Sequence, residues 1–137
     1  MPSCKTLVVD DFAAIRRFVC SLLEERTQFR VTEASDGLEA IKKAEELQPD
    51  LILLDIGLPN LTGIEVARRI CQLVPAARIL FVSQESSRSV VQEALSLGTG
   101  YVHKQSLSVD LLPAIEALLA GKRFVSSSLE FREGVSA

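Results

Sequence analysis

Hydrophobic residues along the chain gather in short runs, and the clearest run is 51–54, where four consecutive apolar residues lie between Asp50 and Asp55. A strand with one solvated face alternates polar and apolar residues, so this unbroken run predicts a short strand buried on both faces. Runs that predict further buried strands occur at 5–10, 78–83 and 100–104. The run 30–34 mixes polar with apolar residues, which is typical of a strand at a sheet edge.

Between these runs, apolar residues recur at helical spacing. The pattern predicts five helices, over residues 13–25, 36–48, 62–74, 87–97 and 108–121. Asp36 and Thr62 each precede a glutamate by three residues, which predicts two capping boxes. We expect Gly98 to end the fourth helix as a C′ glycine and Ser108 to cap the fifth. After residue 122 the periodicity is lost, which indicates a tail.

Five strands that alternate with five helices predict an α/β fold with a doubly wound parallel sheet and helices on both faces. The common flavodoxin-like strand order for such a chain is 2-1-3-4-5. That order places a ligand at the switch point between strands 1 and 3, and it places the polar strand 30–34 at the outer edge.

Composition narrows the class of protein. The 137 residues fit one domain, and a formal charge of −3 gives no basic footprint for nucleic acid. No apolar stretch approaches the ~20 residues that span a bilayer, so we expect no membrane segment. The three cysteines are far apart and suggest neither a disulfide framework nor zinc, which favours a cytoplasmic protein.

Polar side chains follow four of the five predicted strands. Asp10 and Asp11 end the first, Asp55 the third, Ser83 the fourth and Lys104 the fifth. Three carboxylates at one sheet edge repel one another, and oxygen ligands of this kind suit Mg²⁺. An ammonium and a hydroxyl complete what phosphoryl transfer to an aspartate requires. Asp55 stands alone on the central strand and is the candidate nucleophile, whereas the Asp10–Asp11 pair suits a metal.

These motifs resemble the receiver domain of bacterial two-component response regulators. The resemblance rests on the segments 7–11, 54–59, Ser83 and 101–104, and it covers residues 4–121. It implies that Asp55 accepts a phosphoryl group from a sensor histidine kinase or a phosphotransfer protein. It further implies a switch that is not an enzyme. The Mg²⁺ ligands would be Asp10, Asp11, Asp55 and the backbone carbonyl of Gly57; Lys104 would bind the phosphoryl group, and Ser83 with Tyr101 would form the conformational switch.

The segments 97–102 and 120–126 look most like receivers of the NarL/FixJ type, which precede a LuxR-like DNA-binding domain. Residues 122–137 are then a tail or the start of a linker to an output domain that this chain lacks, and transcription is the implied output. A homodimer through the face formed by helix 4, strand 5 and helix 5 is a further implication. Many receivers have proline after the lysine, but this chain has Gln105, so we expect the Lys104–Gln105 peptide bond to be trans.

Two other functions compete with this interpretation. A stand-alone receiver would act as a phosphate shuttle or through protein partners. A phosphatase of the haloacid-dehalogenase type shares the aspartate nucleophile, but such enzymes carry D-x-D-x-T where this chain has Asp10, Asp11 and Phe12. A nucleotide-binding module is weaker still, because no glycine-rich phosphate loop follows the first strand.

Overall fold

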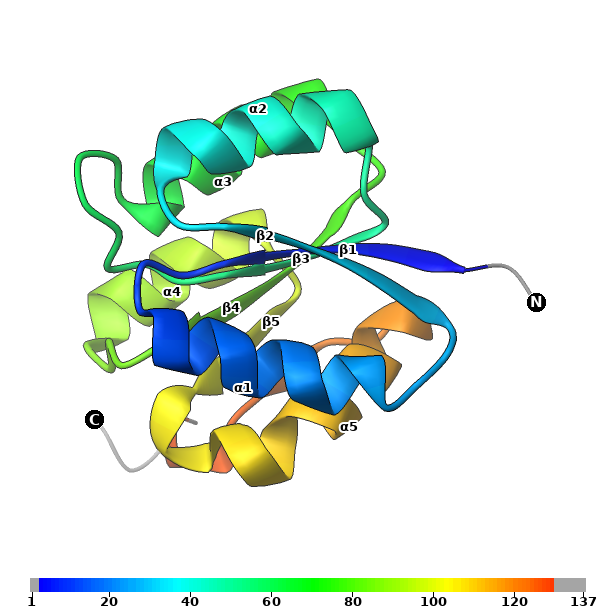
Figure 1. The fold of residues 1–137 in the computed structure, drawn as a ribbon. Coiled ribbons are helices and arrows are strands. Elements are labelled where there is room, and N and C mark those ends of the chain that lie inside the picture. Colours follow the sequence, from blue (N-terminus) through cyan, green and yellow to red (C-terminus); the bar gives the residue numbers. More distant parts are fainter. Residues whose placement is uncertain (1–2, 130–137) are drawn as a thin grey trace.

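The computed structural model describes residues 3–129 as one parallel sheet covered by helices on both faces (Figure 1). The strands are β1 (Cys4–Val9), β2 (Phe29–Ala34), β3 (Leu51–Leu54), β4 (Arg78–Ser83), β5 (Gly100–His103) and β6 (Phe124–Val125). The helices are α1 (Ala13–Glu24), α2 (Gly37–Leu47), α3 (Gly63–Leu73), α4 (Arg88–Leu97) and α5 (Leu107–Leu119), with short 3-10 turns at Lys104–Ser106 and Ser127–Leu129.

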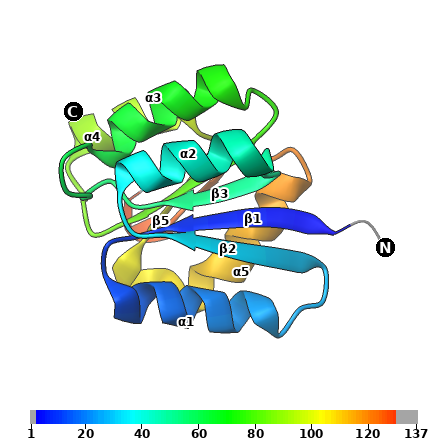
Figure 2. The same cartoon turned by 45° about the horizontal axis from the view of Figure 1, so that its top comes forward.

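The sheet separates two hydrophobic clusters. Helices α2, α3 and α4 cover one face, and α1 and α5 cover the other (Figures 1 and 2). Side chains alternate between the faces along each strand, so Leu7 and Val9 pack under α2 and α3 while Val8 packs under α1 and α5. All four side chains of β3 are buried, as the unbroken apolar run predicts.

The strand order is β2-β1-β3-β4-β5-β6, which confirms the predicted 2-1-3-4-5 order. All pairs are parallel, and Val9 of β1 lies beside Leu54 of β3. The residues that follow these two, Asp10 and Asp55, therefore emerge side by side at the carboxyl edge of the sheet. This edge is where β1 turns into α1, at the left of Figure 1.

Helix starts agree with the sequence in part. At α3 the capping box is complete: Glu65 N–H bonds to the Thr62 hydroxyl, and the Glu65 carboxylate accepts from Thr62. At α2 the Asp36 carboxylate accepts from Glu39 N–H, but the Glu39 carboxylate turns to Ser35 N–H. The second predicted box is therefore only half formed.

The predicted C-terminal conformation of α4 and the predicted N-cap of α5 are both wrong. Gly98 ends α4 in an extended conformation (φ −120°) and not in the left-handed one. It is glycine because a Cβ there would lie 2.7 Å from the carbonyl oxygen of Ile79. The last helix begins at Leu107, directly after the 3-10 turn, with Ser106 at its N-cap, so Ser108 lies inside the helix and does not cap it.

The predicted tail begins too early. Residues 124–125 form β6, which pairs in parallel with β5, and Leu129 is buried in the cluster on the α2–α3–α4 face. The sheet thus has six strands in the described region, and β5 is not an edge strand along residues 100 and 101. Residues 130–137 lie outside the described residues.

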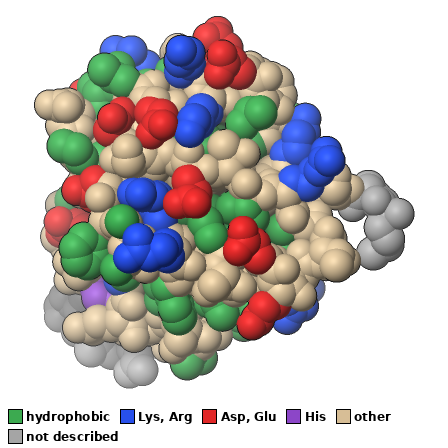
Figure 3. Space-filling view, viewed as in Figure 1, with side chains coloured by type: hydrophobic (Ala, Val, Ile, Leu, Met, Phe, Trp, Pro, Cys, Tyr) green, Lys and Arg blue, Asp and Glu red, His purple; other side chains and the backbone are tan. Residues whose placement is uncertain are grey.

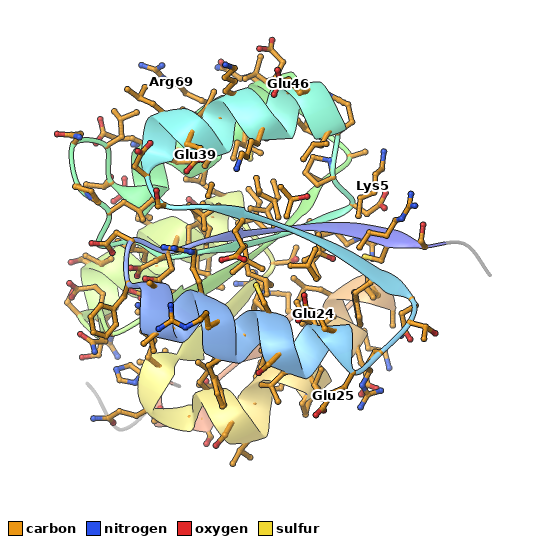
Figure 4. The ribbon with its side chains drawn as sticks, viewed as in Figure 1. Lys5, Glu24, Glu25, Glu39, Glu46 and Arg69 are labelled. Atoms are coloured by element: carbon orange, nitrogen blue, oxygen red, sulfur yellow. The ribbon has the colours of Figure 1, made fainter. Side chains whose placement is uncertain are left out.

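One face of the described part of the chain carries charged side chains of both signs. On the face in Figure 3, Lys and Arg side chains are interspersed with Asp and Glu. Lys5, Glu24 and Glu25, labelled in Figure 4, lie toward the other end of the sheet from the β1–α1 turn. Among residues 3–129, no helix has the length and hydrophobicity needed to cross a membrane.

Candidate functional site

Three carboxylates meet at the carboxyl edge of the sheet. One oxygen from each of Asp10, Asp11 and Asp55 lies within 4.8 Å of the others. Asp10 and Asp55 are 3% and 5% exposed, whereas Asp11 is exposed. The topology explains the cluster, because β1 and β3 are neighbours and each ends one residue before an aspartate. The predicted convergence of these residues is confirmed.

Lys104 lies between the two buried carboxylates. Its Nζ is 2.8 Å from Oδ2 of Asp10 and 3.3 Å from Oδ2 of Asp55. Burial opposes the positive charge, but the hydrogen bond to Asp10 and the attraction of both carboxylates outweigh it, so the pKa of Lys104 is raised. Burial also raises the pKa of Asp10, against the opposing hydrogen bonds from Lys104 and from Phe12 N–H.

Each buried carboxylate has its two oxygens engaged differently. Oδ1 of Asp10 accepts from Phe12 N–H at 2.9 Å, and Oδ1 of Asp55 accepts from Gly57 N–H at 3.3 Å. The Oδ2 atoms both face Lys104. Backbone amides of the two loops therefore fix the planes of the carboxylates, and the lysine holds their free oxygens.

The backbone of Asp55 is also held in place by the start of α3. A Cβ at Gly63 would lie 2.1 Å from the carbonyl oxygen of Asp55, so the start of α3 packs directly against the end of β3. Gly63 N–H also donates to the carbonyl oxygen of Ile56 at 2.8 Å. The loop that carries Asp55 is thus held by a helix start that only glycine permits.

A solvent-open cavity of about 520 Å³ covers the acidic cluster. Its lining comes from the loops after β1, β3 and β4 and from the residue after β5: Asp11, Phe12, Asp55, Ile56, Gly57, Ser83, Gln84, Glu85, Ser86 and Lys104. All four polar strand ends identified in the sequence thus surround one space. A small anionic group placed there would meet the ammonium of Lys104, the hydroxyl of Ser83 and the carboxylate of Asp55.

The donor set fits a hard divalent cation. Three carboxylates supply only oxygen ligands, and one of them, Asp11, is open to solvent, as a cation that keeps several waters requires. Gly57 lines the same cavity, and its N–H binds Asp55. The role of the Gly57 carbonyl as a ligand stays a prediction.

Ser83 lines the cavity, and Tyr101 is bonded to the same loop after β4. Ser83 is 2% exposed, and its Oγ accepts from Glu85 N–H at 3.1 Å. Tyr101 is fully buried, its ring stacks on Phe81 with centroids 6.1 Å apart, and its hydroxyl donates to the carbonyl oxygen of Glu85 at 2.7 Å. Burial raises the pKa of Tyr101 to about 12.

His103 is a site neighbour that the sequence does not reveal. Its place beside Lys104 at the end of a predicted edge strand favours a partly exposed packing residue. That prediction is wrong, because His103 is 8% exposed and its ring bonds to Gln84 and Gln105. The His103 amide donates to the hydroxyl of Ser126. The burial of His103 could not be predicted, because no hydrophobic periodicity indicates that Ser126 belongs to the folded domain. The residues described contain no cis peptide bond, which confirms the trans Lys104–Gln105 bond.

Arg16, which no motif in the sequence marks, also supports the site. Its Nη1 donates to the carbonyl oxygen of Asp10 at 2.7 Å, and its Nε donates to Glu33 at 3.0 Å. The guanidinium thus ties the loop after β1 to the end of β2.

Comparison with known proteins gives consistent results. The family model described as response regulator receiver domain matches residues 6–116. The chain is 34% identical over 125 residues to the transcriptional activator protein ExaE of Pseudomonas putida, covering 90% of this chain and 58% of that protein. It is 31% identical over 113 residues to the chemotaxis protein CheY of Listeria monocytogenes, covering 82% of this chain and 95% of that one.

Solved structures agree with these relatives. A two-component response regulator of the LuxR family from Aurantimonas sp. SI85-9A1 superposes with a TM-score of 0.86 at 36% identity, over 93% of this chain and 92% of that chain. The receiver domain of the putative response regulator NarL from Mycobacterium tuberculosis gives 0.82 at 27% identity, over 89% and 100% of the two chains. The chain spans less than two thirds of the length of the first curated relatives it matches.

Proposed function

Because the chain belongs to the response regulator receiver domain family, we propose that it is a signalling switch in which Asp55 accepts a phosphoryl group. The observation that carries the assignment is the position of Asp55. It directly follows the central strand β3, it is 5% exposed yet lines the cavity, and one of its oxygens faces Lys104.

The transfer uses this chain's own groups as follows. An Oδ atom of Asp55 attacks phosphorus, the bond from phosphorus to the donor's histidine nitrogen breaks, and that nitrogen takes up a proton. Lys104 releases Asp55 and pairs with a phosphoryl oxygen, for which its ammonium is suited. The Ser83 hydroxyl donates to a second phosphoryl oxygen.

Asp10, Asp11, Asp55 and the Gly57 carbonyl would hold Mg²⁺. When bound, the cation neutralises the negative charge that the three carboxylates and the phosphoryl group bring together. The cation and Lys104 would then compete for the carboxylate of Asp10, which pairs with Lys104 in this structure. We expect Lys104 to move toward the phosphoryl group as Asp10 turns to the metal.

The donor partner in this proposal is a sensor histidine kinase or a phosphotransfer protein. The output is transcriptional, which is supported by the relatives whose printed names describe transcriptional activators and regulators. The phosphoacceptor domain in this proposal extends from residue 4 to at least residue 129, which is supported by the pairing of β6 with β5 and by the burial of Leu129. Phosphorylation promotes a homodimer through the face formed by α4, β5 and α5. Apart from assisting its own phosphorylation and slow dephosphorylation, the chain is not an enzyme, and it acts in the cytoplasm.

A second function is supported by the CheY relatives. These proteins are covered over 95% of their length, so a receiver of this size exists without an attached output domain. A stand-alone receiver would pass its phosphoryl group on or bind a protein partner through the same face.

The deciding experiment is incubation with acetyl phosphate and Mg²⁺, followed by intact-mass analysis. We expect a mass increase of one phosphoryl group in the wild-type protein and none after chelation of Mg²⁺. Asp55→Asn should show no adduct, whereas Asp36→Asn, which changes a carboxylate at a helix cap, should be phosphorylated normally. An adduct of equal yield on Asp55→Asn would refute the assignment.

A further inference from the structure

Ser126 is a fully buried serine in a segment that the sequence pattern marks as tail. Three hydrogen bonds attach it to the rest of the domain. Its N–H donates to the carbonyl oxygen of Tyr101 at 2.9 Å, and its Oγ accepts from His103 N–H at 3.0 Å and donates to Oδ2 of Asp110 at 2.7 Å. Ser126 thus contacts β5 through both backbone and side chain, and it contacts α5.

The side chain of Ser126 accepts a hydrogen bond that the backbone of a longer β6 would otherwise accept from β5. β6 has only two residues, paired with Gly100 and Tyr101 of β5. The next outward amide of β5, that of His103, has no backbone partner on β6 and bonds to the Ser126 hydroxyl instead. A buried amide without a partner is strongly disfavoured, so this hydroxyl stabilises the last residue of β5 in its place.

The ring of His103 is hydrogen-bonded to two loops of the site, the loop after β4 and the turn after β5. Its Nδ1 accepts from Gln105 N–H at 3.1 Å, which leaves the hydrogen on Nε2, 3.1 Å from the carbonyl oxygen of Gln84. Gln105 follows Lys104 in the 3-10 turn, and Gln84 follows Ser83. The ring therefore joins the loop that presents the ammonium to the loop that presents the hydroxyl.

The segment 124–129 is packed on the same region. Leu129 is 3% exposed, within the core cluster that contains Tyr101. Ser128 and Leu129 line a cavity of about 620 Å³ together with Gln84, His103 and Lys104. The described end of the chain thus borders the same cavity as Lys104, which carries part of the proposed chemistry.

We propose that Ser126 is a positioning residue, which acts through His103 to hold Lys104 in place and so couples the docking of segment 124–129 to phosphoryl binding. The inference rests on the proposed function, because Lys104 must be the phosphoryl ligand. Coupling is reciprocal: if docking favours the bound position of Lys104, then a group that binds Lys104 stabilises docking.

The test compares Ser126→Ala with Ser127→Ala, whose side chain is exposed one residue away. Affinities for Mg²⁺ alone and for beryllofluoride with Mg²⁺ are measured by NMR titration. We expect Ser126→Ala to bind beryllofluoride roughly tenfold more weakly while its Mg²⁺ affinity stays unchanged or rises slightly, because the metal needs the carboxylates and not Lys104. Ser127→Ala should match the wild type.

Amide exchange without any ligand gives a second readout. In Ser126→Ala the Gln105 amide should exchange faster than in Ser127→Ala, although Ser126 does not contact it, because the His103 ring no longer holds its position. If Ser126→Ala does not fold, Asp110→Ala removes only the acceptor that orients the hydroxyl, and it should show the same two effects at smaller size.

The inference is overturned if Ser126→Ala, or Asp110→Ala in its place, binds beryllofluoride as the wild type does, or if the Gln105 amide is unaffected. Equal weakening of Mg²⁺ and beryllofluoride binding would also overturn it, since that outcome indicates general destabilisation. Failure of the wild-type protein to bind beryllofluoride would refute the proposed function and this coupling together, whereas normal wild-type binding with an unaffected Ser126→Ala refutes the coupling alone.

Discussion

Tyr101 donates its hydroxyl hydrogen to the backbone carbonyl oxygen of Glu85 at 2.7 Å. The backbone N–H of Glu85 in turn donates to Ser83 Oγ at 3.1 Å. The two proposed switch residues therefore hold opposite sides of one residue in the β4–α4 loop. If Ser83 turns toward a phosphoryl oxygen, the Glu85 amide is released and the loop must find a new position, with Tyr101 attached to it.

The first prediction follows from this arrangement. Ser83→Ala should still be phosphorylated, because Asp55 is untouched, but the NMR shifts that beryllofluoride and Mg²⁺ cause around Tyr101 should be largely lost. Coupling energies between sites are typically about 1–3 kcal/mol, so the unphosphorylated protein should sample the active form. Ser86→Ala, another serine that lines the cavity, is the matched control. Wild-type shifts confined to residues near Asp10, Asp55 and Lys104 would show that the switch assignment is wrong.

A second prediction concerns the metal. Asp11→Asn should weaken Mg²⁺ binding by roughly tenfold or more, with little change in the free energy of unfolding, because Asp11 is exposed. Titration with Mg²⁺ followed by amide shifts, together with thermal unfolding, measures both quantities. Glu24→Gln, at the far end of α1, is the control and should bind Mg²⁺ normally. Undiminished affinity in Asp11→Asn would remove this residue from the ligand set.

A third prediction compares two glycines near Asp55, Gly57 in its loop and Gly63 at the start of α3. Gly63→Ala should lower the free energy of unfolding by about 2 kcal/mol or more, because the new methyl group would lie 2.1 Å from the Asp55 carbonyl oxygen. Gly57→Ala should change stability by no more than about 0.5 kcal/mol, because nothing lies within 4 Å of a Cβ there. Denaturant unfolding of the two variants checks the contrast, and equal stabilities would contradict it.

The open space at Gly57 leads to a fourth prediction. Gly57→Arg should fold normally and slow the hydrolysis of phosphorylated Asp55, because a long side chain would obstruct the path of the attacking water. Loss of the phosphoryl mass with time gives the rate. The control is Gly57→Ala, which leaves most of the path open. A rate in Gly57→Arg that equals or exceeds the wild-type rate would count against this role.

The fifth prediction concerns alkaline pH. Tyr101 is the only tyrosine, and burial raises its pKa to about 12 from an ordinary value of 10. The unfolded chain loses this proton first, so the free energy of unfolding should fall as pH rises from 10 to 12. Tyrosinate absorbance should therefore appear near pH 12 or together with unfolding. Tyr101→Phe should lack this component of the pH dependence. Ionisation of the folded wild-type protein near pH 10 would contradict the buried hydroxyl.

Much of the fold and the acidic cluster could be predicted because both depend on simple patterns. Four apolar runs end in polar residues, and the carboxyl ends of parallel strands lie at one edge, so Asp10, Asp55, Ser83 and Lys104 had to meet. The strand order is the common one for five parallel strands of this kind, and the polar character of 30–34 agrees with the place of β2 at the sheet edge.

The residues that escaped prediction lack a periodic signal. A strand of two residues, β6, is too short to show alternation, and its last contact is made by a serine side chain. Gly98 is glycine because of a neighbouring carbonyl group on β4, a tertiary contact that local sequence does not encode. His103 is buried by the same unpredicted segment, so one missed strand explains two wrong expectations.

The shortness of β6 also bears on solubility and on protein engineering. A long, exposed edge strand invites pairing with other chains, and very short edge strands are one means by which proteins avoid it. Phe124 and Val125 present only two residues at this edge, beside the longer and largely apolar β5. A receiver shortened to end at residue 122 would uncover β5, and we expect such a fragment to aggregate where the full chain stays monodisperse.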